Sequence, residues 1–112
     1  MTGFRLSPVA DGQIDEIYDY TADRWSEDQA DAYVRDLTAE FDRIASRKVP
    51  WRTLPASFDV DGYSRNWGRH VIYWRRGQHE RITVVAILHE RMDQIARART
   101  AFAAESADPD AD

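Results

Sequence analysis

The sequence predicts an α+β fold in which a helical hairpin packs on a small, mainly antiparallel sheet. Two observations support this prediction. Residues 8–44 repeat apolar side chains at helical spacing, whereas residues 63–89 alternate or run apolar as strands do. A helical hairpin must bury its apolar side, and in a chain of 112 residues the sheet is the only large partner. The predicted element order is β-α-α-β-β-β-α.

The chain is predicted to open with one short strand and two helices. Phe4-Arg5-Leu6 alternates apolar and polar residues as a half-buried strand does. The pair Ser7-Pro8 then combines a preferred N-cap with a proline at the first helical position. The segment Ser26-Glu27-Asp28-Gln29 is a capping box that starts the second helix. Since only a short break near Arg24 separates the helices, they should lie antiparallel.

Three strands and a last helix are predicted in the second half, after a loop over residues 47–62. The run from Ile82 to Leu88 is apolar on both faces, which predicts a central strand covered on both sides. Asp93 is a predicted N-cap for the last helix. We therefore expect one domain over residues 1–104 and a flexible acidic tail over residues 105–112. The predicted strands are Tyr63–Trp67, Arg69–Arg76 and Glu80–His89.

Composition excludes several classes of protein. The chain has no cysteine, so it has no disulfide, no thiolate zinc site and no cysteine nucleophile. No apolar run is long enough to cross a membrane, and the first residues lack the apolar stretch of a secretory signal. A cytoplasmic protein without a membrane association is therefore expected. No phosphate-binding glycine loop is present, and we expect no cofactor.

The net charge of −5 hides an uneven distribution. Residues 1–46 carry a net charge of −7, residues 47–107 carry +5, and the remaining residues carry −3. Fourteen of the fifteen basic residues are arginine, which suits bidentate contacts to carboxylate or phosphate. The chain therefore has an acidic helical half and an arginine-rich sheet half, and each half can bind a different partner.

Two histidines of the sheet half are candidate functional residues. His70 and His89 stand nineteen residues apart without a third ligand at metal-binding spacing, so no metal site is expected. His89 ends a buried strand, which fits either a structural histidine or an active-site side chain. Histidine and arginine together could cleave RNA without a metal, because a base removes the 2′-hydroxyl proton while guanidinium groups hold the phosphate. Spacing alone does not decide between these readings.

Four segments, in this order and at matching spacing, resemble the ParE branch of the RelE/ParE toxins of type II toxin–antitoxin systems. The resemblance covers about residues 4–98. It implies the RelE/ParE toxin fold, which agrees with the element order predicted above. The segments are Phe4–Pro8 followed by Asp15–Tyr20, Arg24–Ala30, Arg65 with Gly68–Arg75, and Ile87–Asp93.

The resemblance also implies a function. A ParE-type toxin poisons DNA gyrase, stabilises the cleaved gyrase–DNA complex and stops replication and growth, and a ParD-like antitoxin holds it inactive in a hetero-oligomer. The related RelE branch instead cleaves ribosome-bound mRNA, in which case His89 and Arg69 would be the catalytic residues. A third possibility is a non-toxic relative that only binds its antitoxin. The last helix after Arg91-Met92-Asp93 favours the ParE branch.

Two binding surfaces follow from these expectations. The target would meet the basic sheet side through Arg65, Arg69, His89 and Arg91. The antitoxin would bind the helical hairpin and a sheet edge. We expect no sequence-specific DNA binding from the toxin alone. The hairpin residues predicted to contact the antitoxin are Ile17, Tyr18, Tyr33, Leu37 and Phe41.

Overall fold

The computed structural model describes residues 3–106, which form three α-helices and one five-stranded sheet. The strands lie in the order β1-β5-β4-β3-β2. β1 runs parallel to β5, and the other three pairs are antiparallel. The predicted α+β class and the mainly antiparallel sheet are therefore confirmed. The elements are β1 Gly3–Leu6, α1 Pro8–Arg24, α2 Glu27–Ala45, β2 Arg52–Thr53, a 3-10 turn η1 Ala56–Phe58, β3 Tyr63–Trp67, β4 His70–Arg76, β5 Arg81–His89 and α3 Gln94–Ser106.

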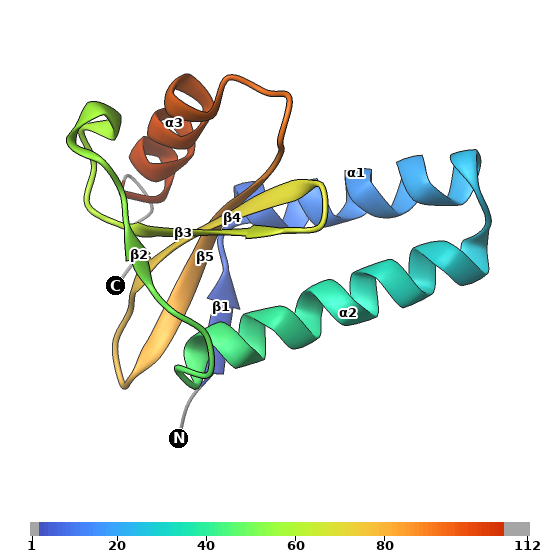
Figure 1. The fold of residues 1–112 in the computed structure, drawn as a ribbon, viewed down its shortest axis with the longest axis horizontal. Coiled ribbons are helices and arrows are strands. Elements are labelled where there is room, and N and C mark those ends of the chain that lie inside the picture. Colours follow the sequence, from blue (N-terminus) through green and yellow to red (C-terminus); the bar gives the residue numbers. More distant parts are fainter. Residues whose placement is uncertain (1–2, 107–112) are drawn as a thin grey trace.

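Helices cover both faces of the sheet. The α1–α2 hairpin packs on one face and extends well beyond the sheet, while α3 lies on the other face (Figure 1). The hairpin face buries Leu37 and Phe41 of α2 against Trp74 of β4. The α3 face buries Phe102 against Tyr73. The predicted central strand, apolar on both faces, is confirmed in β5.

Ser7 joins α1 to the sheet through three hydrogen bonds. Its Oγ accepts from the backbone N–H of Ala10 at 3.0 Å, which confirms the predicted N-cap. The same hydroxyl donates to the carbonyl oxygen of Val85 at 2.8 Å, and the Ser7 N–H donates to that of Val84 at 3.0 Å. Ser26 also caps its helix as predicted, since its Oγ accepts from Gln29 N–H at 3.0 Å.

A β-bulge interrupts the pairing of β4 with β5. Tyr73 lies opposite Ala86, but Trp74 lies opposite Val84, so Val85 has no partner on β4. Val85 and Ala86 consequently both belong to the core on the α3 face. A bulge of this kind shifts the register of every later pair by one residue.

Three boundaries differ from the prediction. The predicted loop over residues 47–62 contains β2 and η1, which are too short to leave a periodic pattern. β5 begins at Arg81 instead of Glu80, because Glu80 has φ 62° and belongs to the turn. β4 begins at His70 because Gly68, with φ 57°, starts the preceding turn.

The predicted tail starts too early at residue 105. α3 continues to Ser106, and Glu105 is only 2% exposed. Its carboxylate forms ion pairs with Arg5 of β1 and with Arg75 of β4, the latter at 3.0 Å. Glu105 was missed because a charged residue in an acidic stretch gives no sign of burial. The rest of the predicted tail, residues 107–112, lies outside the described residues.

The two serine caps provide a matched test of how α1 is held. Replacing an N-cap serine with alanine costs about 1 kcal/mol. We expect this cost for Ser26→Ala. Ser7→Ala should lower the free energy of unfolding by about 2 to 3 kcal/mol, because it also leaves the buried Val85 carbonyl without its donor. Urea unfolding of both variants measures the difference. Equal losses would show that the bond to Val85 contributes nothing.

Candidate functional site

Three of the four residues predicted to bind the target meet at one corner of the sheet. Arg69 lies in the β3–β4 turn, His89 ends β5, and Arg91 follows two residues later. The two segments are tied together, because Glu90 N–H donates to the Arg69 carbonyl at 2.9 Å. The Arg69 guanidinium also lies 3.5 Å from the Glu90 carboxylate, in an exposed ion pair. Arg69 and Arg91 are both exposed here.

Arg65 does not belong to this corner. Its Nε lies 2.5 Å from Oε2 of Glu40, whose side chain is only 7% exposed. The same carboxylate also pairs with Arg43 at 3.2 Å. The Arg65 guanidinium therefore fastens β3 to α2. Its side chain is still 32% exposed, so its assignment to the target surface stays a prediction.

The structure adds His70 and Tyr33 to the corner. His70 lies directly opposite His89 in the β4–β5 ladder, and their ring centroids are 5.5 Å apart. The Tyr33 hydroxyl of α2 lies 2.7 Å from His70 Nδ1. Counting pairs back from the β4–β5 turn would place Leu88 opposite His70. The bulge at Val85 makes it His89 instead, and sequence spacing could not show this.

Burial keeps both His70 and Tyr33 uncharged. It lowers the pKa of His70, and the neighbouring His89 lowers this pKa further. Burial also raises the pKa of Tyr33, so the phenol keeps its proton. His89 Nδ1 accepts a hydrogen bond from Arg91 N–H at 3.2 Å, which leaves its Nε2 to carry the proton of the neutral ring. The corner thus offers two imidazoles and two guanidinium groups, a combination suited to anionic ligands.

A buried tyrosine fixes the position of this corner relative to α3. Tyr73 donates its hydroxyl proton to Gln94 Oε1 at 2.7 Å, and Gln94 Nε2 donates to the carbonyl of His89 at 2.8 Å. Burial raises the pKa of Tyr73 to about 12, so this hydroxyl remains a donor at neutral pH. The end of β5 is therefore held by its backbone, and the His89 side chain is left partly exposed.

Comparison with known proteins identifies the family. Residues 4–94 match the sequence model of the ParE toxin of the type II toxin–antitoxin system parDE. The chain belongs to the ParE toxin family. It is similar to Toxin ParE1 of Mycobacterium tuberculosis (strain ATCC 25618 / H37Rv), with 38% identity over 92 residues, covering 80% of this chain and 91% of that protein. Toxin ParE1 of Caulobacter vibrioides is 34% identical over 94 residues, covering 83% and 94% of the two chains. Toxin ParE of Escherichia coli is 30% identical over 97 residues, covering 87% and 93%.

Membership of the ParE family implies an antitoxin partner, so the exposure of the hairpin residues matters. Leu37 and Phe41 are completely buried against the sheet, and their assignment to the antitoxin surface is therefore corrected. Both lie on the apolar stripe of α2, which the hairpin uses for its own core. Ile17, Tyr18 and Tyr33 are half-buried and can still meet a partner.

Two exposed aromatic residues were missed by the sequence reasoning. Tyr20 is 61% exposed and Trp25 is 71% exposed, near the end of the hairpin that extends beyond the sheet (Figure 1). The Arg24 guanidinium lies 5.6 Å from the Tyr20 ring centroid. Their exposure depends on how far the hairpin reaches past the sheet, and helical spacing does not report this.

Two other kinds of site are absent from the part of this ParE-family toxin that the structure describes. Within residues 3–106, no group of three or more metal-ligating side chains comes together. In the same part of the chain, every helix is too short or too polar to cross a membrane.

The lowered pKa of His70 predicts a dependence of stability on pH. The unfolded chain takes up a proton on His70 near its ordinary pKa of about 6.5, whereas the folded protein does so only at lower pH. The free energy of unfolding should therefore fall as pH decreases from about 7 to 5, and His70→Gln should lose less stability over this range. Urea unfolding at several pH values measures the difference.

An NMR titration checks the cause directly. In the native protein, we expect the His70 pKa to lie below about 6.5, and His89→Asn should raise it, because the neighbouring His89 lowers this pKa. An unshifted His70 pKa in the native protein would contradict the geometry.

Proposed function

We propose that this ParE-family toxin acts in the cytoplasm, where it binds and inhibits DNA gyrase. By stabilising the cleaved gyrase–DNA complex, it stops the growth of the cell. The observation that carries the proposal is the family match over residues 4–94, together with relatives named ParE from three bacteria. A neighbouring ParD-like antitoxin would neutralise the toxin. In this role the toxin helps to maintain the genetic element that encodes it, since cells that lose the antitoxin stop growing.

The sheet corner supports a binding mechanism. Arg69 and Arg91 are exposed and lie on segments that are fixed by backbone hydrogen bonds. A surface that is already ordered loses little conformational entropy when it binds. Arginine is also the charged residue most enriched at binding hot spots. We therefore assign the gyrase contact to Arg69 and Arg91, with His89 between them in the chain.

A supercoiling assay with purified gyrase tests this proposal. Micromolar wild-type toxin should inhibit supercoiling of relaxed plasmid and should accumulate cleaved DNA. The double variant Arg69→Gln/Arg91→Gln should need about tenfold more protein, as expected for the loss of interface residues worth about 1.4 kcal/mol together.

The control for this assay is Arg35→Gln/Arg97→Gln, which removes the same charge from two exposed positions outside the corner. This control should inhibit gyrase as the wild type does. If wild-type toxin neither inhibits supercoiling nor accumulates cleaved DNA, the proposed target is wrong.

A second candidate function, metal-independent cleavage of mRNA, is favoured by one observation. His70 and His89 face each other at 5.5 Å beside two arginines, so one imidazole could act as base and the other as acid. The same protein preparations can be incubated with ribosomes and mRNA. Cleavage that His89→Ala abolishes, without any effect on gyrase, would support this second function over the first.

We place the antitoxin on the helical hairpin and along the free edge of β1, one of the two outermost strands of the sheet. The hairpin carries most of the acidic residues of the chain, which favours a basic segment of the antitoxin. Tyr18 lies between α1 and α2, and its hydroxyl donates to Asp31 at 3.0 Å. Its ring is therefore held in place on the surface of the hairpin.

Two tyrosines on α1 allow a matched test of the antitoxin surface. Tyr18→Ala should weaken binding of the antitoxin's C-terminal segment about tenfold, because it removes an ordered aromatic contact. Tyr20→Ala changes the same residue type on a different side of the helix and should change the affinity less than about twofold. Calorimetric titration measures both. A larger loss for Tyr20→Ala would move the interface to the other side of α1.

A further inference from the structure

Four exposed cationic side chains lie near the end of the sheet where β2 begins and β4 ends, away from the corner described above. We call this group, Arg47, Lys48, Arg52 and Arg76, the cationic end. Arg47 and Arg76 both lie over the ring of Trp51, with their Cζ atoms 3.4 Å and 5.5 Å from its centroid. Among the ion pairs within residues 3–106, none involves these four side chains.

The backbone at Arg47 is unusual for an arginine. Helix α2 ends in a Schellman motif, because Lys48 N–H donates to the Arg43 carbonyl at 2.9 Å and Arg47 N–H donates to that of Ile44 at 3.1 Å. This motif places Arg47 at φ 62°, where glycine is the preferred residue. An arginine at such a position carries backbone strain, and strained positions are enriched at functional sites.

The platform beneath Arg47 is rigid. Trp51 Nε1 donates to the Ile44 carbonyl at 2.8 Å, and the ring packs against Tyr63 and Trp74 with centroids 4.9 Å and 5.9 Å away. Trp74 is completely buried, so Trp51 rests on the core. The Arg47 guanidinium is therefore held against a fixed aromatic surface.

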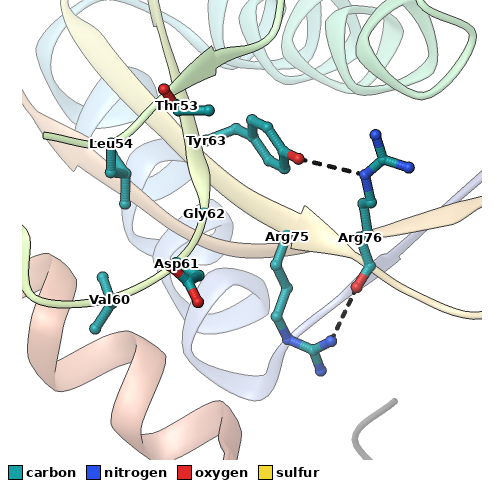
Figure 2. A pocket seen from close by; sticks show the side chains of 8 residues that line it. All are labelled: Thr53, Leu54, Val60, Asp61, Gly62, Tyr63, Arg75 and Arg76. Atoms are coloured by element: carbon teal, nitrogen blue, oxygen red, sulfur yellow. Dashed lines mark hydrogen bonds between the residues drawn. The ribbon is translucent and has the colours of Figure 1, made fainter. Parts of the chain in front are cut away.

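Arg76 is fixed from the other side. Its Nε donates to the Tyr63 hydroxyl at 3.3 Å, as Figure 2 shows beside the hollow between β3 and the end of β4. The neighbouring Arg75 side chain points away from that of Arg76 (Figure 2). Its guanidinium pairs with Glu105 on the α3 face. Arg76 thus keeps its charge available on the same side of the sheet as Arg47.

We propose that the cationic end binds the phosphodiester backbone of DNA without reading its sequence. Planar guanidinium groups match phosphate oxygens in a bidentate geometry, and fixed arginines lose little entropy when they bind. The acidic hairpin repels DNA, so the molecule would turn its cationic end towards the duplex. This inference rests on the proposed function, in which the target is gyrase with DNA bound.

Fluorescence anisotropy with a labelled duplex of about 20 base pairs tests the proposal between about 50 and 200 mM salt. Arg47→Gln/Arg76→Gln should bind roughly a hundredfold more weakly at the lowest salt, and the negative slope of log K against log salt should become shallower by about 2. The charge-matched control Arg35→Gln/Arg97→Gln should keep the wild-type slope. An unchanged slope in Arg47→Gln/Arg76→Gln would overturn the proposal.

A second variant separates binding from folding. Arg47→Gly suits the left-handed backbone, so it should fold at least as stably as the wild type in urea while it loses DNA affinity as Arg47→Gln does. Retained affinity in Arg47→Gly would overturn the role of the guanidinium.

Two further probes decide which polyanion the surface accepts. A labelled polyglutamate peptide and a single-stranded RNA of the same length as the duplex are titrated in parallel. DNA would be overturned as the ligand if either probe bound more tightly than the duplex and if only Arg47→Gln/Arg76→Gln lost affinity for that probe.

The gyrase assay keeps this inference distinguishable from the proposed function. Suppose that Arg47→Gln/Arg76→Gln poisons gyrase as well as the wild type does and binds DNA with the same affinity. DNA binding by the cationic end is then wrong, and the proposed function stands. If DNA binding depends on the cationic end as expected but the wild type does not affect gyrase, the inference about DNA stands and the proposed function is wrong.

Discussion

The β-bulge at Val85 determines how the rest of the molecule is arranged around the central strand. β1 ends opposite Val84, so beyond that point this edge of β5 has no neighbouring strand. Helix α1 takes over: the Ser7 hydroxyl donates to Val85, and the Gln13 side-chain carbonyl accepts from Ile87 N–H at 2.7 Å. Buried backbone groups need such partners. The hairpin thus starts beside the bulged residue of β5, and the bulge brings His89 opposite His70.

Two buried carboxylates show that several of the arginines have a structural role. Glu40 pairs with Arg43 and Arg65 on the hairpin face, and Glu105 pairs with two arginines on the α3 face. Breaking a buried pair by removing one partner typically costs about 3 to 5 kcal/mol, whereas an exposed pair is worth about 1 kcal/mol or less. Arg5, Arg65 and Arg75 thus hold the layers together, because each pairs with a carboxylate of another element. Among the exposed cationic residues, Arg69 and Arg91 lie at the sheet corner and four others form the cationic end.

Local patterns in the sequence were sufficient to predict most of the fold. The caps at Ser7 and Ser26, the apolar stripe of α2 and the doubly apolar β5 each reflect interactions between near neighbours, and all are confirmed. The candidate site was predicted less completely, because it depends on long-range register. Arg65 and Arg69 look alike in the sequence, yet one lies beside a buried glutamate and the other beside solvent. Only the packed structure distinguishes them.

The parallel pairing of β1 with β5 has a consequence for the synthesis of the toxin. Gly3–Leu6 can join the sheet only after Arg81–Val84 has left the ribosome, and Arg5 meets Glu105 later still. Contacts between such distant segments form slowly, because a long loop must close before they contribute stability. A nascent chain therefore carries an incomplete sheet until Arg81–Val84 has emerged. An antitoxin already present in the cell has that interval in which to reach the toxin before it is active.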